Sequence, residues 1–151
     1  MDQKKIYASL SPADTELVGE ELAKDMISNS SLPRFVALFG DLGVGKTAFT
    51  RGFTRVFSPS ARVKSPTFSL VNEYKGEGCS VFHFDMYRIE SEDDLYSIGF
   101  YDYLDRRGIC LTEWSENIEY ALPESFVRVE IIKDSTDNVD SRQIEISIIN
   151  A

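Results

Sequence analysis

The chain has 151 residues, 42% hydrophobic and 27% charged, which suits one hydrophobic core, so we expect a single domain over residues 1–151. Its formal charge of −9, from 25 acidic and 16 basic residues, argues against direct binding of nucleic acid, because that requires a basic face. No apolar run approaches the roughly 18 residues of a membrane span, and the N-terminus lacks the apolar segment of a signal peptide. We therefore expect a cytoplasmic protein with no membrane partner.

The first third of the chain predicts a helix, a buried strand and a second helix. Residues 11–27 begin with a serine cap followed by proline, and they place apolar side chains four residues apart. Residues 35–39, FVALF, are continuously apolar, which is typical of a strand covered on both faces. Residues 47–57 again have helical spacing, with Gly52 as a tolerated weak point.

The rest of the chain predicts five more strands and one more helix. In order they are a strand at 67–75, a strand within 77–85, a helix at 91–104, a strand at 108–114, and strands at 126–132 and 142–149. A polar stretch joins the last two strands, so we expect a C-terminal hairpin at an antiparallel end of the sheet. Together the elements predict an α/β fold with a mostly parallel central sheet and antiparallel additions.

Side chains that bind transition metals are scarce. Cys79 and Cys110 lie in or beside apolar runs without C-x-x-C spacing, which is typical of reduced core thiols. His83 is the only histidine, and alternation along its strand places it on the same face as Asp85. We therefore expect a packed or hydrogen-bonded histidine and no cysteine–histidine metal site.

A glycine-rich loop, GDLGVGKT, lies between the first predicted buried strand and the helix that follows it. It matches G-x-x-x-x-G-K-[ST], in which glycines let backbone N–H groups approach phosphate oxygens at the positive end of a helix. Lys46 would reach the β and γ phosphates, and the Thr47 hydroxyl would bind Mg²⁺. A glycine-rich turn without a ligand is the alternative, and the strand–loop–helix context disfavours it. The predicted nucleotide contacts in this segment are Gly40, Asp41, Gly43, Val44, Gly45, Lys46, Thr47 and Ala48.

Two acidic residues close neighbouring predicted strands and are candidates to complete a Mg²⁺ site. They are Asp85, at the end of SVFHFD, and Glu113, at the end of GICLTE. Mg²⁺ prefers oxygen ligands and usually takes only one or two from the protein. Glu113 ends the more continuous apolar run and is favoured, although either residue would also suit a strand end that faces water.

Thr67 lies twenty residues after Thr47, in the segment VKSPTF, where Pro66 stiffens the chain. Nucleotide switch segments place a threonine hydroxyl near the metal and the γ-phosphate. An ordinary Ser-Pro turn would explain the same residues. The chain contains no N-K-x-D string, so nothing in it selects guanine over adenine.

The segments GDLGVGKT, VKSPTFSLVNEY, HFDMYRI, DLYSIGFYDYL and ICLTEW, in this order and at this spacing, closely resemble the TsaE family. That family is the small ATPase of bacterial tRNA threonylcarbamoyladenosine synthesis. The resemblance implies a P-loop NTPase-like three-layer fold, ATP and Mg²⁺ as cofactors, and TsaB and TsaD proteins as partners that install the threonylcarbamoyl group. ATP hydrolysis would then reset the complex between rounds.

The resemblance also implies roles for individual residues. The implied catalytic residues are Lys46, Thr67, Asp85 and Glu113. The implied metal ligands are Thr47, Asp85 and Glu113. Trp114 follows the metal ligand in the family's EW pair, and the segment that contains Pro12 and Thr15 would lie near the adenine. The chain has EWSE where EWP is usual, a departure that touches no metal ligand.

Two other functions stay open at this point. A small-molecule P-loop kinase would need a lid with arginines, and the arginines of this chain are scattered. The other is a nucleotide-dependent binding switch with negligible catalysis. If the chain is an ATPase, we expect slow hydrolysis gated by partners, because no residue is clearly placed to orient the attacking water.

Overall fold

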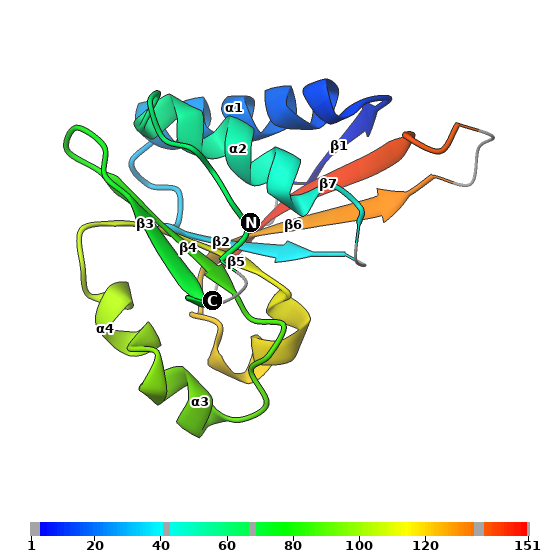
Figure 1. Ribbon diagram of the computed structural model, residues 1–151. Helices are drawn as coiled ribbons and strands as arrows, with labels where there is room; N and C mark the ends of the chain where they lie inside the picture. Colours follow the sequence, from blue (N-terminus) through cyan, green and yellow to red (C-terminus); the bar gives the residue numbers. More distant parts are fainter. Residues whose placement is uncertain (1–3, 41–42, 67–68, 135–137, 151) are drawn as a thin grey trace.

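The computed structural model describes residues 4–40, 43–66, 69–134 and 138–150, and these form one seven-stranded sheet with helices on both faces (Figure 1). The elements in chain order are β1 (Lys4–Ser9), α1 (Pro12–Ser28), β2 (Phe35–Phe39), α2 (Lys46–Phe57), β3 (Val71–Tyr74), β4 (Ser80–Asp85), α3 (Glu92–Ser97), α4 (Phe100–Leu104), β5 (Gly108–Glu113), the 3₁₀ segment η1 (Ser115–Ala121), β6 (Phe126–Lys133) and β7 (Arg142–Ile149).

The sheet confirms the predicted fold class. Its strand order is β1-β7-β6-β2-β5-β4-β3, and the four central strands β6, β2, β5 and β4 are parallel. β3, β7 and β1 pair antiparallel with their neighbours, and β6 with β7 forms the expected C-terminal hairpin. β6 thus belongs to both parts, because it pairs parallel with β2 on one side and antiparallel with β7 on the other. The carboxyl ends of the parallel strands therefore meet at one edge of the sheet.

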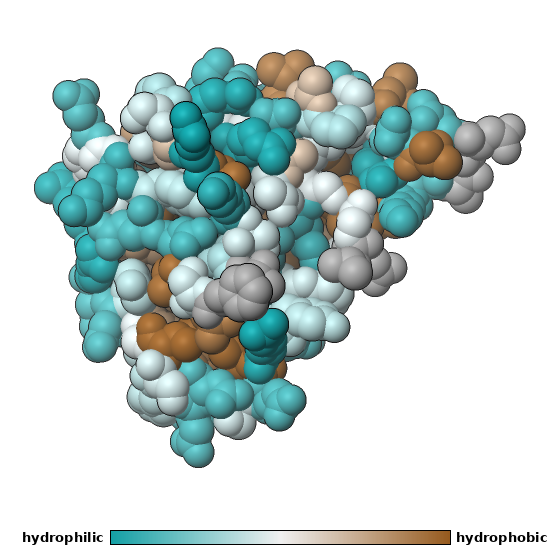
Figure 2. All heavy atoms as spheres, in the orientation of Figure 1, coloured by the Kyte–Doolittle hydropathy of each residue, from teal (hydrophilic) through white to brown (hydrophobic). Residues whose placement is uncertain are grey.

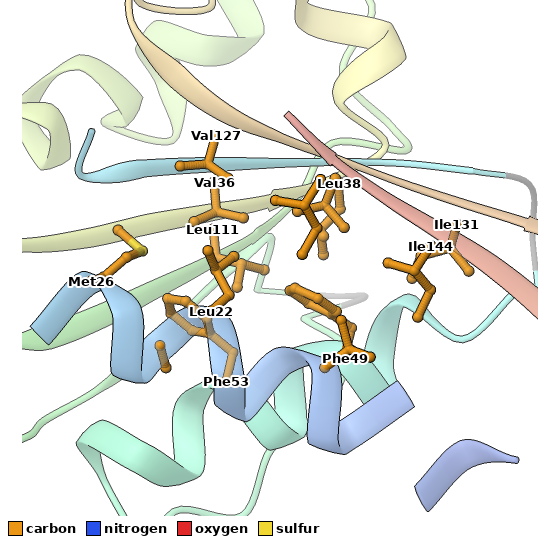
Figure 3. Packing of buried hydrophobic residues seen from close by; sticks show 14 of the residues in the cluster. Leu22, Met26, Val36, Leu38, Phe49, Phe53, Leu111, Val127, Ile131 and Ile144 are labelled. Carbon is orange, nitrogen blue, oxygen red and sulfur yellow. The ribbon is translucent and has the colours of Figure 1, made fainter. Parts of the chain in front are cut away.

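Each face of the sheet has its own apolar core. On one face, alternate residues of the central strands pack against α1 and α2; Figure 3 shows Phe49 and Phe53 of α2 pointing toward Val36, Leu38 and Leu111 of the sheet. On the other face, the neighbouring strand residues pack against α3, α4 and η1. This double burial explains why β2 and β5 have continuous apolar runs instead of alternating ones.

Helices α1 and α2 cross at two glycines. A Cβ atom built on Gly52 would lie 1.9 Å from the carbonyl oxygen of Glu16, and one built on Gly19 would lie 2.3 Å from that of Phe49. Real Cβ atoms do not approach backbone this closely, so the two helices pack in contact only because these positions lack side chains. Gly52 is therefore a packing requirement and more than the tolerated weak point that its sequence context predicted.

Three predictions about elements need correction. β1 was not predicted, because the edge strand Lys4–Ser9 is short, largely exposed and without an apolar alternation. The helix expected at 91–104 is two helices, since Gly99 has a left-handed φ of 74° that interrupts it. Of the strand expected at 67–75, the described part is shorter: β3 comprises only Val71–Tyr74.

The surface in the orientation of Figure 1 is mostly hydrophilic, with one larger hydrophobic patch in its lower half and smaller ones at the top and upper right (Figure 2). This character agrees with a composition in which 27% of the residues are charged. Of the helices in the described ranges, none is both long enough and apolar enough to cross a bilayer.

Candidate functional site

The glycine loop joins the carboxyl end of β2 to the start of α2. Gly40, Gly43 and Gly45 have φ values of 143°, 78° and 110°, a region that residues with a Cβ rarely adopt. Nothing lies within 4 Å of a Cβ built on Gly43, so that glycine is required by its backbone conformation and not by space. The loop thereby delivers the first turn of the twelve-residue helix α2, whose free N–H groups and positive dipole end favour an anion.

Lys46 folds back across this loop. Its Nζ donates a hydrogen bond to the carbonyl oxygen of Gly40 at 2.7 Å and lies 3.8 Å from the centre of the Trp114 ring. Trp114 has a left-handed φ of 58°, so the chain turns sharply after β5 and brings its ring over the lysine. To bind the Lys46 ammonium, a phosphate must replace its hydrogen bond to the Gly40 carbonyl and its cation–π contact with Trp114.

Two carboxylates lie side by side beyond the lysine. Asp85 and Glu113 are the last residues of β4 and β5, and the parallel register pairs them directly. Together with the loop they line a cavity of about 570 Å³. The residues that line this cavity are Gly43, Gly45, Lys46, Thr47, Ser65, Asp85, Tyr87, Glu113 and Trp114. The structure thus brings together residues selected from three separate sequence motifs: Lys46 and Thr47, Asp85, and Glu113 with Trp114.

The two carboxylates have different surroundings. Asp85 is half-buried, and it accepts hydrogen bonds from the backbone N–H of Tyr87 at 3.0 Å and from the Ser65 hydroxyl at 3.5 Å. Glu113 is buried, with 5% of its surface exposed, and its Oε2 forms a hydrogen bond with Nε2 of His83. Because an unpaired buried carboxylate is costly, the histidine contact stabilises Glu113 in place.

A second, smaller cavity of about 200 Å³ lies across the loop from the first. Its lining residues are Ser11, Pro12, Thr15, Gly43, Val44, Gly45, Ala48, Asp140 and Arg142. The loop glycines line both cavities, so a ligand on the loop has room on either side of it. The structure brings Pro12 and Thr15, predicted to lie near the adenine, together with Val44 and Ala48 of the loop.

Residues 9–144 match the family model described as "Threonylcarbamoyl adenosine biosynthesis protein TsaE". The chain belongs to the TsaE family. It is 44% identical over 111 residues to a tRNA threonylcarbamoyladenosine biosynthesis protein TsaE from Haemophilus influenzae, which covers 74% of this chain and 68% of that protein. The TsaE protein from Bacillus subtilis is 37% identical over 114 residues, covering 76% and 69%.

A solved structure gives the same result for the fold. The crystal structure of YdiB from Bacillus subtilis superposes with a TM-score of 0.76 at 26% identity, covering 99% of this chain and 88% of that one. The sequence comparisons therefore establish the family, and this superposition supports the fold.

The site of this TsaE chain includes residues that the sequence analysis did not select. Arg142 of β7 donates from Nε to the carbonyl oxygen of Val44 at 2.9 Å, and its Nη2 lies 3.5 Å from that of Gly43. Glu116 of η1 accepts a hydrogen bond from the N–H of Gly40 at 3.0 Å. Both side chains reach the loop from segments far away in sequence, so no local pattern predicts them.

The residues at this TsaE site fit a hard divalent cation. The Thr47 hydroxyl, Asp85 and Glu113 are oxygen donors that line one cavity, which is the ligand chemistry Mg²⁺ prefers. Within the described ranges, no group of three His, Cys, Asp or Glu side chains could hold a metal by itself. Such a sparse set suits Mg²⁺, which completes its shell with water and phosphate oxygens.

Two predicted site residues, Asp41 and Thr67, lie outside the residues that the structure describes.

Proposed function

We propose that this chain binds ATP with Mg²⁺ at the glycine loop and hydrolyses it, as an accessory protein of tRNA threonylcarbamoyladenosine biosynthesis. The observation that carries the proposal is that Lys46, Thr47, Asp85 and Glu113 converge on one 570 Å³ cavity at the start of α2. Relatives that are 44% and 37% identical are named as proteins of this biosynthesis. TsaB and TsaD proteins are the proposed partners, and they rather than this acidic chain would hold the tRNA.

The proposed mechanism assigns one task to each group of the chain. The loop N–H groups and Lys46 would bind the β and γ phosphates, and Thr47, Glu113 and Asp85 would hold the metal ion. Bound Mg²⁺ would offset negative charge on the phosphate oxygens. Water attacks the γ-phosphorus and the bond from that phosphorus to the bridging oxygen breaks, giving ADP and inorganic phosphate. The proton that the water releases passes to a phosphate oxygen or to bulk water, because Asp85 and Glu113 are assigned to the metal ion.

The test is to incubate the pure protein with Mg²⁺ and ATP labelled in the γ-phosphate, alone and with small-molecule acceptors. An ATPase releases labelled inorganic phosphate, whereas a kinase transfers the label to an acceptor. A binding switch would bind ATP and release neither product. Failure to bind ATP at all would overturn the proposal.

The loop assignment itself is tested with Lys46→Ala. Removal of the ammonium that lies at the loop should weaken ATP affinity by at least about tenfold, because charge-assisted hydrogen bonds to phosphate are worth about 1.5–3 kcal/mol. Titration calorimetry with ATP and Mg²⁺ measures the change. Lys24→Ala, at an exposed position of α1, is the control and should bind as the wild type does. Equal affinity and equal turnover in Lys46→Ala would contradict the assignment.

A further inference from the structure

His83 is a buried polar residue that the proposed mechanism does not use. It is the only histidine of the chain, it lies in the middle of β4, and none of its surface is exposed. Its Nε2 contacts Oε2 of Glu113, whereas its Nδ1 has no hydrogen-bond partner among the described residues. Within the described structure, the hydrogen bond from Nε2 to Glu113 is therefore the only one that the His83 side chain makes.

The strand register places His83 behind Glu113 as seen from the cavity. Val81 and Leu111 belong to the core under α1 and α2, so alternation puts His83 and Glu113 on that same face of the sheet. Glu113 lines the 570 Å³ cavity, but His83 does not. Any influence of the histidine on a ligand in the cavity must therefore pass through the glutamate.

A buried glutamate needs such a neighbour if it is to hold one orientation. A carboxylate on a side chain with three rotatable bonds loses more rotamer freedom when it is fixed than a shorter side chain does. A hydrogen bond to one oxygen fixes the carboxylate and leaves the second oxygen free to point into the cavity. Metal ligands in proteins are commonly oriented by partners of this kind.

We propose that His83 is a positioning residue for Glu113: its Nε2–H holds one carboxylate oxygen and so presents the other to Mg²⁺. The proposal rests on the proposed function, because it assumes that the cavity takes a nucleotide with its metal ion. The positioning role requires that the ring hydrogen of His83 is on Nε2 and that Nδ1 carries no hydrogen. That tautomer suits a buried Nδ1 without a partner, since an orphaned N–H group there would cost more free energy.

The tautomer is tested without any nucleotide. Because the chain has a single histidine, protein labelled with ¹⁵N-histidine gives one set of imidazole signals. A long-range ¹H–¹⁵N spectrum should show the hydrogen on Nε2, and that signal should shift in Glu113→Gln, where the acceptor loses its charge. A hydrogen on Nδ1, or signals indifferent to Glu113→Gln, would overturn the proposal whether or not the protein binds ATP.

The positioning role is tested with a matched pair of variants. His83→Gln can place an amide N–H near the position of Nε2, whereas His83→Leu cannot donate. We expect the Mg²⁺ concentration for half-maximal ATP binding, measured by calorimetry, to rise about tenfold in His83→Leu and to stay within about threefold of wild type in His83→Gln. Affinity for ATP in excess EDTA should be the same in all three proteins.

The control separates positioning from folding. If His83 acts through Glu113, then His83→Leu should add nothing further to the Mg²⁺ dependence in a Glu113→Gln background. Urea unfolding of each variant establishes that it is folded under the assay conditions. Equal Mg²⁺ dependence in wild type and His83→Leu, or equal losses in His83→Leu and His83→Gln, would overturn the positioning role. A wild type that binds no ATP would instead remove the proposed function.

Discussion

At the scale of single residues, the two carboxylates of the site are distinguished by their neighbours. Glu113 is buried and paired with His83, whereas Asp85 is half-buried and accepts hydrogen bonds from Ser65 and from the backbone of Tyr87. We predict that Glu113→Gln raises the Mg²⁺ requirement of ATP hydrolysis by about tenfold or more, and that Asp85→Asn raises it less. A Mg²⁺ titration of the steady-state rate measures both. The opposite ranking would make Asp85 the principal metal ligand.

A second prediction at this scale concerns Cys110, which lies in the core with 3% of its surface exposed. Burial raises the pKa of its thiol to about 12, because the thiolate would lose its hydration. The folded protein keeps this proton at a pH where the unfolded chain, whose thiol has its ordinary pKa of about 9, has lost it. The stabilising contribution is therefore complete below about pH 9 and is lost as the pH rises from there toward 12.

The measurement is urea unfolding of the wild type and of Cys110→Ala at pH 8 and pH 10.5. Ionisation costs about 1.4 kcal/mol for each pH unit above the unfolded pKa, so the wild type should lose about 2 kcal/mol more than the variant over this interval. Titration of tyrosines and lysines affects both proteins and cancels in the comparison. A constant difference between them at both pH values would show that the thiol is not protected by burial.

Single residues were predictable from the sequence where one short segment contains the whole signal. The glycine loop specifies Lys46 and Thr47 because its spacing and its place between strand and helix are local. Asp85 and Glu113 were selectable because each ends an apolar run. The pairing of His83 with Glu113 and the contact of Arg142 with the loop depend on which strands become neighbours, and strand order is not a local property.

At the scale of elements, the crossing of α1 and α2 makes Gly52 a sensitive position. Gly52→Ala gains up to about 1 kcal/mol of helix propensity but forces the helices apart at the backbone of Glu16, and such overpacking costs about 1–3 kcal/mol or more. The clash is with backbone and cannot be relieved by a rotamer change, so we predict a net loss of about 2 kcal/mol in the free energy of unfolding. Urea denaturation measures it.

The control for this prediction is Lys24→Ala, at an exposed position of α1, which should change the free energy of unfolding by less than about 0.5 kcal/mol. A Gly52→Ala protein as stable as the wild type would mean that α1 and α2 can separate at little cost. The same substitution on an isolated helix would be stabilising, so the sign of the effect alone decides whether close helix packing is present.

Elements with a distinct apolar pattern in the sequence were predictable. Elements that depend on contacts with distant parts of the chain were not. β2, β6 and β7 were expected within one residue of their observed bounds, because each has a distinct apolar pattern. The continuous pattern of 91–104 concealed the break at Gly99, since a helix glycine and a left-handed glycine look the same in sequence. β1 is a strand because it pairs with the edge of β7, from Ser9 with Arg142 to Lys4 with Ser147, and no local pattern near β1 contains that information.

At the scale of the whole molecule, the proposed phosphate loop and metal ligands are accompanied in the 570 Å³ cavity by Lys46 but by no arginine among the described residues. Arg55 and Arg106 form ion pairs away from the site, with Glu16 and Glu73 respectively. Arg142 contacts carbonyl oxygens of the loop but does not line this cavity. An arginine supplied by a partner can raise the rate of phosphoryl transfer by about 10³ to 10⁵. We therefore expect efficient hydrolysis to need a residue from another protein.

We predict that the isolated chain hydrolyses ATP at less than about 1 s⁻¹, the lower end of independent phosphoryl-transfer enzymes, and that TsaB and TsaD proteins change this rate. The measurement is a steady-state assay of phosphate release from the pure chain, alone and with the partner proteins. The Lys46→Ala protein, purified in the same way, measures contaminating ATPase activity. Arg88, an exposed residue in the loop after β4, is the candidate that could act from within the chain, so Arg88→Ala is assayed in parallel. A rate above about 1 s⁻¹ that does not change when the partners are added, and that falls in Arg88→Ala, would show that this chain completes its own active site.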